Sequence, residues 1–243
     1  MKERKLWKIH AVAVLGFIAL GVLALGSATT PPEYVIEPLF EVVVVGDFEW
    51  METPHVADDN GIRLVRYIGT ARNVLIPMQE GGRAVTEIGS RAFLDGVHIT
   101  SVTIPNSVIH IMSGAFANNR LMHVTIPNSV VSIGSFAFDM NTLVSITIPN
   151  SVIHIGNGAF ANNPTLTSVT IGNGVGFLSE NVFSGGSLRN VTQISIGANV
   201  RLHSAETSGR VWSSFRAAYE ANNFRAGVYT LNPITGQWSW IPR

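Results

Sequence analysis

Cysteine is missing from the 243-residue sequence, and charged residues make up only 13% of it. Without cysteine the chain has no disulfide framework, no thiolate metal site, no cysteine nucleophile and no lipid-modified N-terminal cysteine. The low charged fraction, together with 46% hydrophobic residues, favours a well-buried structure over disorder. A chain of this length forms one or two compact domains or one modest repeat array.

Charge is scarcest in the middle of the chain, where residues 97–200 have no net charge. The charged side chains of this stretch are Arg120, Asp139, Glu180 and Arg189. Proteins that bind nucleic acids need a basic stripe that neutralises a run of phosphates. We therefore expect no nucleic-acid partner.

The N-terminal segment, residues 1–28, has the pattern of an export signal. Lys2, Arg4, Lys5 and Lys8 precede an apolar stretch from Ile9 to Gly26, and small residues follow. This order predicts a signal peptide, cleaved between Ser27 and Pro31. The alternative is an uncleaved N-terminal anchor, because the stretch lies near the ~17-residue lower limit for spanning a bilayer. In both cases we expect export to the periplasm, the cell surface or the medium, with membrane contact only through this segment if it is uncleaved.

An internal repeat dominates residues 97–200. Four 16-residue blocks align without gaps and begin at Ser101, His123, Ser145 and Ser168, which are 22, 22 and 23 residues apart. A period of 20 to 29 residues is typical of a leucine-rich-repeat solenoid, in which each unit is too small to bury its own apolar face and stacks on its neighbours. Partial matches extend the array at both ends.

Each block begins with a short strand. β-branched residues alternate with hydroxyl residues, which predicts a half-buried strand. Two columns are expected to point inward: Val102, Val124, Ile146, Val169 and Ile194, and then Ile104, Ile126, Ile148, Ile171 and Ile196. One column between them is expected to point outward: Thr103, Thr125, Thr147, Thr170 and Ser195.

The rest of each block supplies a turn and the remaining core. Pro105, Pro127 and Pro149 end the strand, and Asn106, Asn128 and Asn150 follow as turn residues. Further core columns end in an aromatic wedge at Phe116, Phe138, Phe160 and Phe183, which we expect to lie in a single file. Asn119, Asn141 and Asn163 form a polar column, which we expect to bond the backbone of successive turns.

The pattern L-x-x-V-x-I-P-x-x-V-x-x-I-G-x-x-A-F resembles that of bacterial BspA-like, treponemal-type leucine-rich-repeat surface proteins over about residues 58–200. The segment from Gly61 to Phe93 also resembles the module that precedes such repeats. The resemblance implies a surface or secreted protein engaged in adhesion and protein–protein contact, without enzymatic activity. Two features depart from the family: the asparagine column stands where the family often has cysteine, and Gly172–Gly174 replaces Pro-Asn-Ser.

The predicted fold is thus a mainly β leucine-rich-repeat solenoid of short strands, loops and turns. The domains are residues 1–28, an N-terminal strand segment and capping module at 29–96, the repeats at 97–200 and a C-terminal cap at 201–243. Glu41–Trp50 is expected to form a strand, and Asp58–Gly61 a turn rather than a calcium loop. Val211–Asn222 predicts a helix, and Gly227–Leu231 with Gln237–Ile241 a β-hairpin, which together cover the open end of the stack.

Histidine offers the main candidates for chemistry. His110 and His154 share a column, but they are expected two rungs apart, or ~9–10 Å, which is too far for a shared zinc ion. His123 lies beside serines, but no orienting carboxylate and no oxyanion motif accompany it. Asp139 and Glu180 are two units apart, which does not suit a glycosidase pair. We expect no enzymatic activity, no cofactor and no metal site.

We expect the chain to bind an extracellular protein, or a glycan, through the outer side of the repeat strands. We call this surface the strand face; its residues are Ser101, Thr103, Met122, His123, Thr125, Ser145, Thr147, Ser168, Thr170 and Gln193. One alternative function is a structural envelope component that self-associates. Another is a carbohydrate-binding module, with an aromatic platform built by Phe224, Tyr229, Trp238 and Trp240.

Overall fold

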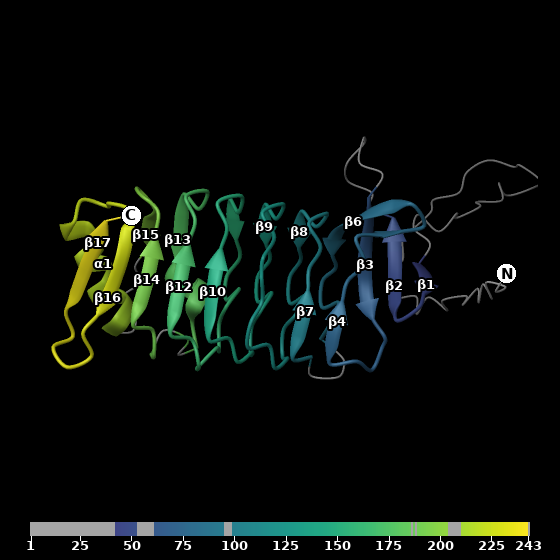
Figure 1. Cartoon of the computed structure of the whole chain (residues 1–243), viewed down its shortest axis with the longest axis horizontal. Coiled ribbons are helices and arrows are strands. Elements are labelled where there is room, and N and C mark those ends of the chain that lie inside the picture. Colours follow the sequence, from purple (N-terminus) through teal and green to yellow (C-terminus); the bar gives the residue numbers. More distant parts are fainter. Residues whose placement is uncertain are drawn as a thin grey trace, which may run out of the picture.

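The computed structural model describes residues 42–52, 61–94, 99–185, 187, 189–203 and 210–242. The elements follow one another along a single axis, with the N-terminal strands at one end and the helix and last hairpin at the other (Figure 1). The predicted leucine-rich-repeat solenoid is confirmed. The predicted signal peptide lies outside the described residues, and so does the predicted turn at Asp58–Gly61 except for Gly61.

One side of the solenoid is an eight-stranded sheet in the order β1-β2-β3-β6-β8-β9-β11, with β5 paired to β6. From β3 onward the rungs along this path are parallel, and each short strand of the repeats holds a His-Ile or Ser-Ile pair. The strands are β1 (Val42–Val45), β2 (Phe48–Glu52), β3 (Ile62–Tyr67), β5 (Gln79–Glu80), β6 (Arg83–Ile88), β8 (His110–Ile111), β9 (Ser132–Ile133) and β11 (His154–Ile155). The sequence predicts core positions here but not a second sheet.

The opposite side carries the strands that begin each repeat. They form a two-stranded parallel sheet, β4-β7, and a five-stranded sheet, β10-β12-β14-β16-β17. The strands are β4 (Asn73–Leu75), β7 (Ser101–Thr103), β10 (Ser145–Ile148), β12 (Ser168–Ile171), β14 (Gln193–Ile196), β16 (Gly227–Leu231) and β17 (Trp238–Pro242). The predicted strand at His123–Ile126 does not form, so the two sheets are separated by one unpaired rung.

A file of stacked aromatic rings runs through the core. Phe116, Phe138 and Phe160 are fully buried, and their ring centroids are 5.2 Å and 5.4 Å apart, with interplanar angles of 13° and 4°. Tyr67 and Phe93 extend the file toward the N-terminus, and Phe183 toward the C-terminus. The prediction of a single file of aromatic side chains is confirmed. Burial of this many rings makes the file a large source of hydrophobic stabilisation.

The asparagine column lies beside this file and satisfies the backbone at one corner of each turn. Asn141 accepts a hydrogen bond from the Leu121 N–H at 3.0 Å, and its Nδ2 donates to the carbonyl groups of Phe116, Phe138 and Asp139. Asn119 and Asn163 make the equivalent contacts in their own turns. At the end of the column the hydroxyl of Ser187 accepts from the Asn163 N–H and donates to a carbonyl oxygen. The predicted structural role of the column is confirmed.

The C-terminal cap consists of helix α1 (Arg210–Ala221) and the antiparallel hairpin β16–β17. α1 buries Trp212, Phe215 and Tyr219, and Trp212 lies next to Phe183 at the end of the aromatic file. β16 pairs antiparallel with β14, so the hairpin continues the sheet beyond the last repeat strand. The predicted helix and hairpin are confirmed. Within the last repeats, β13 (Phe177–Ser179) pairs in parallel with β15 (Arg201–His203), and a short 3-10 helix spans Glu180–Phe183.

The N-terminal end differs from the prediction of one strand at Glu41–Trp50. The described part of this segment forms two strands, β1 and β2, which pair antiparallel. The turn between them contains Gly46, whose φ is +61°, and Asp47. Glycine adopts this left-handed conformation without steric cost, so the chain reverses where the sequence pattern alone reads as continuous.

No helix among the described residues is long and apolar enough to cross a membrane.

Candidate binding face and groove

The structure gathers the residues of the strand face on one side of the stack. In register, Ser145 lies beside Ser168 and Gln193, and Thr147 lies beside Thr170. Ser101 and Thr103 occupy the equivalent positions on β7. Eight of the ten residues are exposed, including Met122 with 52% of its surface accessible, and Ser168 and Thr170 are half-buried. The sequence therefore located an accessible surface, although nothing in its geometry identifies a partner.

The face is longer than the repeats alone predict. Asn73 and Leu75 of β4 pair with Ser101 and Thr103, and Leu75 is 71% exposed. At the other end Gln193 pairs with Thr230 of β16, which pairs with Ser239 of β17. The predicted strand face did not include Thr230 and Ser239. Their outward hydroxyl groups continue the serine and threonine rows across the hairpin.

Ser195 corrects one prediction. It occupies the outward threonine column, but it is 5% exposed, and its hydroxyl has no hydrogen-bond partner among the described residues. It lies between Thr170 on one side and Val228 on the other. The hairpin adds a covering strand beside β14, a contact that the repeat alignment does not contain.

The rung at His123–Ile126 leaves main-chain groups unpaired. Neither the N–H nor the C=O groups of these four residues hydrogen-bond to another described residue, although they lie between β7 and β10. Proline accounts in part for the lack of pairing at this rung, in contrast to the paired strands β10, β12 and β14. Gly172 and Gly197 donate their N–H groups to the carbonyls of Ile148 and Ile171 at 2.9 Å and 3.1 Å, and so lengthen the ladder. Pro127 and Pro149 stand at the same position in earlier units and have no N–H to donate.

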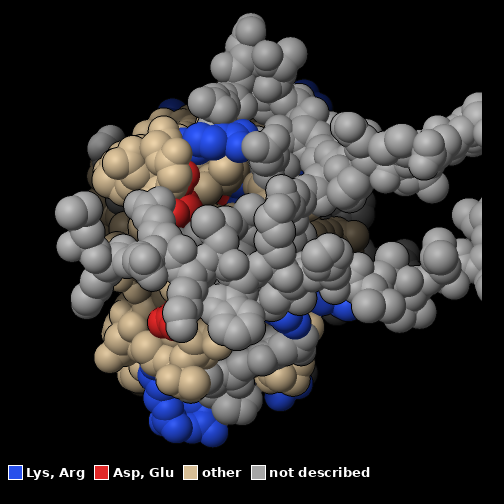
Figure 2. Space-filling model, turned by 90° about the vertical axis from the view of Figure 1, so that its right-hand side faces the viewer, with Lys and Arg blue, Asp and Glu red and all other residues tan. Residues whose placement is uncertain are grey.

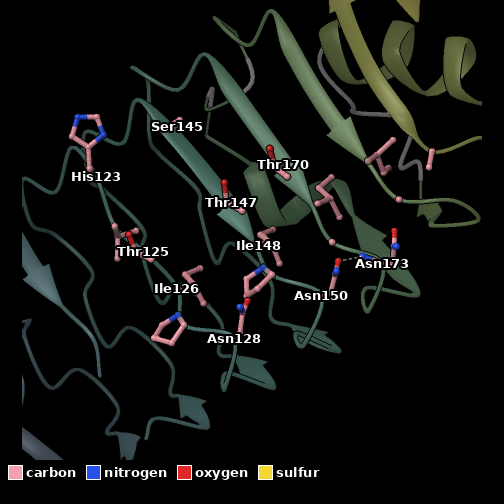
Figure 3. A pocket seen from close by; sticks show the side chains of 18 of the residues that line it. His123, Thr125, Ile126, Asn128, Ser145, Thr147, Ile148, Asn150, Thr170 and Asn173 are labelled. Atoms are coloured by element: carbon pink, nitrogen blue, oxygen red, sulfur yellow. Dashed lines mark hydrogen bonds between the residues drawn. The ribbon is translucent and has the colours of Figure 1, made fainter. Parts of the chain in front are cut away.

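A shallow groove of about 980 Å³ follows the ends of the strands across the stack. We call it the strand-end groove. Figure 3 shows Thr125, Thr147 and Thr170 along one side and Asn128, Asn150 and Asn173 along the other. Asn150 accepts a hydrogen bond from the backbone N–H of Asn173 at 2.8 Å. The sequence identified Asn128 and Asn150 as turn residues, and Asn173 stands at the same position in the next unit. The recurrence of asparagine in one column was the signal that these residues share a surface.

Charged groups lie away from this groove, because none of its lining residues is Lys, Arg, Asp or Glu. Figure 2 views the molecule from the N-terminal end, where acidic and basic side chains both appear. Among the described residues of this region, Arg63 pairs with the buried Glu87, and Arg66 pairs with Glu49 at 2.8 Å. The charge of the N-terminal module is thus partly neutralised within it.

The other candidates for chemistry are dispersed. His110, Ser132 and His154 occupy successive rungs of the eight-stranded sheet, so the two histidines are two rungs apart as predicted. His110 Nδ1 lies 2.7 Å from the Ser132 hydroxyl. No group of three His, Asp or Glu side chains that could hold a metal ion occurs among the described residues. Asp139 instead accepts a hydrogen bond from the Asn162 side chain. The side chain of Glu180 lies outside the described set.

The aromatic residues of the tail do not form an open platform. Tyr229 is buried, and Trp238 and Trp240 are half-buried against the core. Trp238 donates to the Ser214 hydroxyl and Trp240 to the Ala226 carbonyl, while Phe224 is exposed. Burial raises the pKa of the Tyr229 hydroxyl above its ordinary value of 10.0. These rings pack the cap rather than present flat faces for sugar stacking.

Residues 86–203 match the family model described as BspA type leucine-rich repeat region, in six copies. The repeat array belongs to this family. The BspA-type assignment agrees with the stacked phenylalanines and parallel rungs of the structure, and leucine-rich-repeat families are typically non-catalytic. A comparison with curated proteins found no match.

Solved structures of bacterial leucine-rich-repeat proteins are similar to this chain. The T. pallidum leucine-rich-repeat protein is 25% identical, with a TM-score of 0.51, and the match covers 76% of this chain and 100% of that one. The pneumococcal vaccine antigen PcpA is also 25% identical, with a TM-score of 0.49, over 61% of this chain and 35% of that chain. A leucine-rich-repeat protein from Bacteroides ovatus is 18% identical, with a TM-score of 0.39, over 58% and 50% of the two chains.

Proposed function

We propose that this chain is an exported, non-catalytic adhesion protein that binds an extracellular protein partner through the strand face. The observation that carries the proposal is a row of exposed and half-buried serine, threonine, histidine and glutamine side chains along BspA-type repeats. The N-terminal pattern of residues 1–28 supports export. Surfaces on rigid repeat scaffolds are well suited to protein contact, because little conformational entropy is lost on binding.

The composition of the strand face predicts the character of the contact. It contains no Lys, Arg, Asp or Glu side chain, so association gains little electrostatic steering. Aromatic and arginine side chains, which supply most binding energy in protein interfaces, do not occur among its ten residues. Met122 is its large apolar side chain. We expect modest affinity and partner hydrogen bonds with the hydroxyl rows.

Capture experiments test the proposal. The purified chain is immobilised and exposed to extracellular protein fractions, and bound proteins are identified and then re-tested individually. Replacing His123, Thr125 and Thr147 together by alanine should abolish capture and leave the circular dichroism spectrum unchanged, because all three side chains are exposed. The matched control replaces the exposed His154 and Asn157, on other faces of the stack, by alanine.

Two outcomes would contradict the proposal. Capture that survives the triple substitution would place the contact elsewhere. Concentration-dependent assembly of the chain with itself, without capture of any other protein, would favour a structural envelope component. Export is tested separately by N-terminal sequencing of the protein outside the cytoplasm: a start between Ser27 and Pro31 indicates cleavage, and retention of Met1 indicates an anchor.

A further inference from the structure

We infer that the strand-end groove binds a neutral, linear glycan that lies across the strands, along the axis of the stack. This site goes beyond the proposed protein contact, because the groove adds a row of asparagines outside the strand face. Its lining includes three threonines, three asparagines of the facing row and His123 at one end (Figure 3). The inference depends on the charge, the spacing and the unpaired groups of this lining.

The absence of charge in the groove selects a neutral ligand. His123 is its one residue with an ionisable side chain, and no acidic or basic side chain lines it. An anionic polysaccharide or a charged peptide would lose its hydration here without gaining an ion pair. Neutral sugars lose no charge solvation, and their hydroxyl groups both donate and accept hydrogen bonds.

The repeat sets the spacing of the polar groups. Three successive rungs each contribute one threonine hydroxyl and one asparagine amide, and neighbouring rungs are ~4.8 Å apart. A sugar ring in a linear chain is about as long as one rung, so successive sugars meet equivalent groups. An extended peptide advances ~3.3 Å per residue and would fall out of step with the rungs. The groove also runs across the strands, whereas peptides that extend sheets lie along them.

Main-chain groups complete the site. The N–H and C=O groups of His123–Ile126 have no partner among the described residues, and all four residues line the groove. Polar groups in a native structure are normally hydrogen-bonded to protein or water. Hydroxyl groups of a bound sugar offer both a donor and an acceptor to these positions. Asn128 lies beside them and makes no side-chain hydrogen bond with another described residue, so its amide is available as well.

The floor of the groove changes along its length. Pro127 and Pro149 line it in the first units, and Gly172 and Gly197 line it in the later ones. Both glycines are buried, and a Cβ at Gly172 or Gly197 would clash with the Pro149 backbone or the Asn173 side chain of the preceding rung, so glycine here lets successive rungs approach closely. Ala226, at the start of the hairpin, lines the groove at this end. The floor is therefore closely packed, and we expect a chain of several sugars to make its main contacts with the exposed threonine and asparagine side chains on either side of it.

The test uses the purified full chain and four probes: cellohexaose, chitohexaose, mannohexaose and, as the anionic control, hexagalacturonate. Binding is measured by saturation-transfer NMR and by calorimetry. We expect at least one neutral hexasaccharide to bind, its trisaccharide to bind more weakly because it spans fewer rungs, and hexagalacturonate not to bind.

Variants locate the site. Asn128→Ala and Thr147→Val should each weaken binding of that hexasaccharide about tenfold, as the loss of one or two hydrogen bonds does. The control Asn157→Ala, at an exposed asparagine on another corner of the stack, should leave it unchanged. Melting temperatures verify that each variant is folded.

Several results would overturn the inference. One is the absence of binding by all three neutral hexasaccharides at millimolar concentration. Another is unchanged affinity in both Asn128→Ala and Thr147→Val. Binding of an uncharged serine- and threonine-rich peptide in the groove, without any glycan, would assign the groove to proteins. Thr147 belongs to both the strand face and the groove, so Thr147→Val does not separate the two proposals. Asn128 lies outside the strand face, so Asn128→Ala should weaken glycan binding and leave protein capture intact, which distinguishes them.

Discussion

At the scale of single residues, stability is concentrated in side chains that repeat once per turn. Phe138 lies between Phe116 and Phe160, and Asn141 bonds four backbone groups from two successive turns. Each of these side chains therefore connects neighbouring units. Loss of either one should weaken two interfaces at once.

Phe138→Ala should lower the free energy of unfolding by about 3–5 kcal/mol, because it leaves a cavity in the middle of the aromatic file. Chemical denaturation with tryptophan fluorescence measures the change. Met122→Ala, at an exposed position, serves as the control and should shift stability by less than about 0.5 kcal/mol. An unchanged denaturation midpoint for Phe138→Ala would contradict the prediction that the aromatic file is a main source of stability.

Asn141→Leu should cost about 3 kcal/mol or more, although leucine is apolar and the site is buried. The substitution leaves the Leu121 N–H and three carbonyl groups without their partner, and each unsatisfied buried group costs about 1–3 kcal/mol. Thermal melting compares this variant with Asn157→Ala, which alters an exposed asparagine. Equal melting temperatures would show that water replaces the lost amide.

At the scale of elements, the C-terminal cap and the strand ladders are stabilised by different interactions. The cap is held by an aromatic cluster in which Tyr219 donates to the Gly197 carbonyl and accepts from the Val200 N–H. The ladders instead depend on which residue follows each strand. Glycine at positions 172 and 197 adds a hydrogen bond, and proline at 127 and 149 removes one.

The cap should lose stability in alkaline solution. Burial raises the pKa of Tyr219 and of Tyr229 above 10.0, so the folded chain keeps both protons at a pH where the unfolded chain releases them. Stability is therefore complete below about pH 10 and declines as the pH rises from 10 toward the folded pKa. Denaturation midpoints between pH 8 and 11 measure this decline.

Tyr229→Phe should make the alkaline decline smaller, because it removes one of the two groups that release a proton on unfolding. The Tyr229 hydroxyl also hydrogen-bonds Asn222 and the Arg225 carbonyl, so the variant is expected to be less stable than the wild type already at pH 8. The decline of each protein is therefore measured relative to its own stability at pH 8. A decline identical to that of the wild-type chain would show that other groups cause it.

At the scale of the whole molecule, the chain is a one-dimensional stack. The aromatic file runs through the repeats, whereas both sides of the stack carry interrupted sheets: the eight-stranded sheet ends at β11 before β13-β15, and the strand-face side is interrupted at the rung His123–Ile126. Each unit thus contacts the next through the same core positions. Units should be removable one at a time, provided that the register is kept.

Deletion of residues 123–144, one complete unit of 22 residues, should leave a folded protein in which Phe116 stacks on Phe160. We expect cooperative melting at a temperature lower by roughly 5 °C, as a loss of about 2 kcal/mol produces in a chain of this size. Deletion of residues 123–133 alone is the control, because it shifts the register by half a turn. Equal stability of the two deletions would contradict the stack.

Much of the fold could be predicted from the sequence, because its determinants recur at a fixed period. The period located the stacked phenylalanines, the asparagine column and the outward rows of the strand face. The hairpin turn at Gly46 and the second sheet could not be recognised in the same way. A two-residue His-Ile strand has too few residues to show alternation, and its pairing partner lies more than 20 residues away.

The sequence by itself determined the solenoid, since columns of identical apolar residues can share one core only when the units stack. Tertiary structure alone decided which rungs pair, why Ser195 is buried and where the groove lies. These outcomes depend on small differences between neighbouring rungs, namely a missing proline N–H and a hairpin added beside β14. An alignment of the repeats shows the change from proline to glycine at position 172, but it does not show the consequence for pairing, because that consequence arises from contacts between units rather than within one.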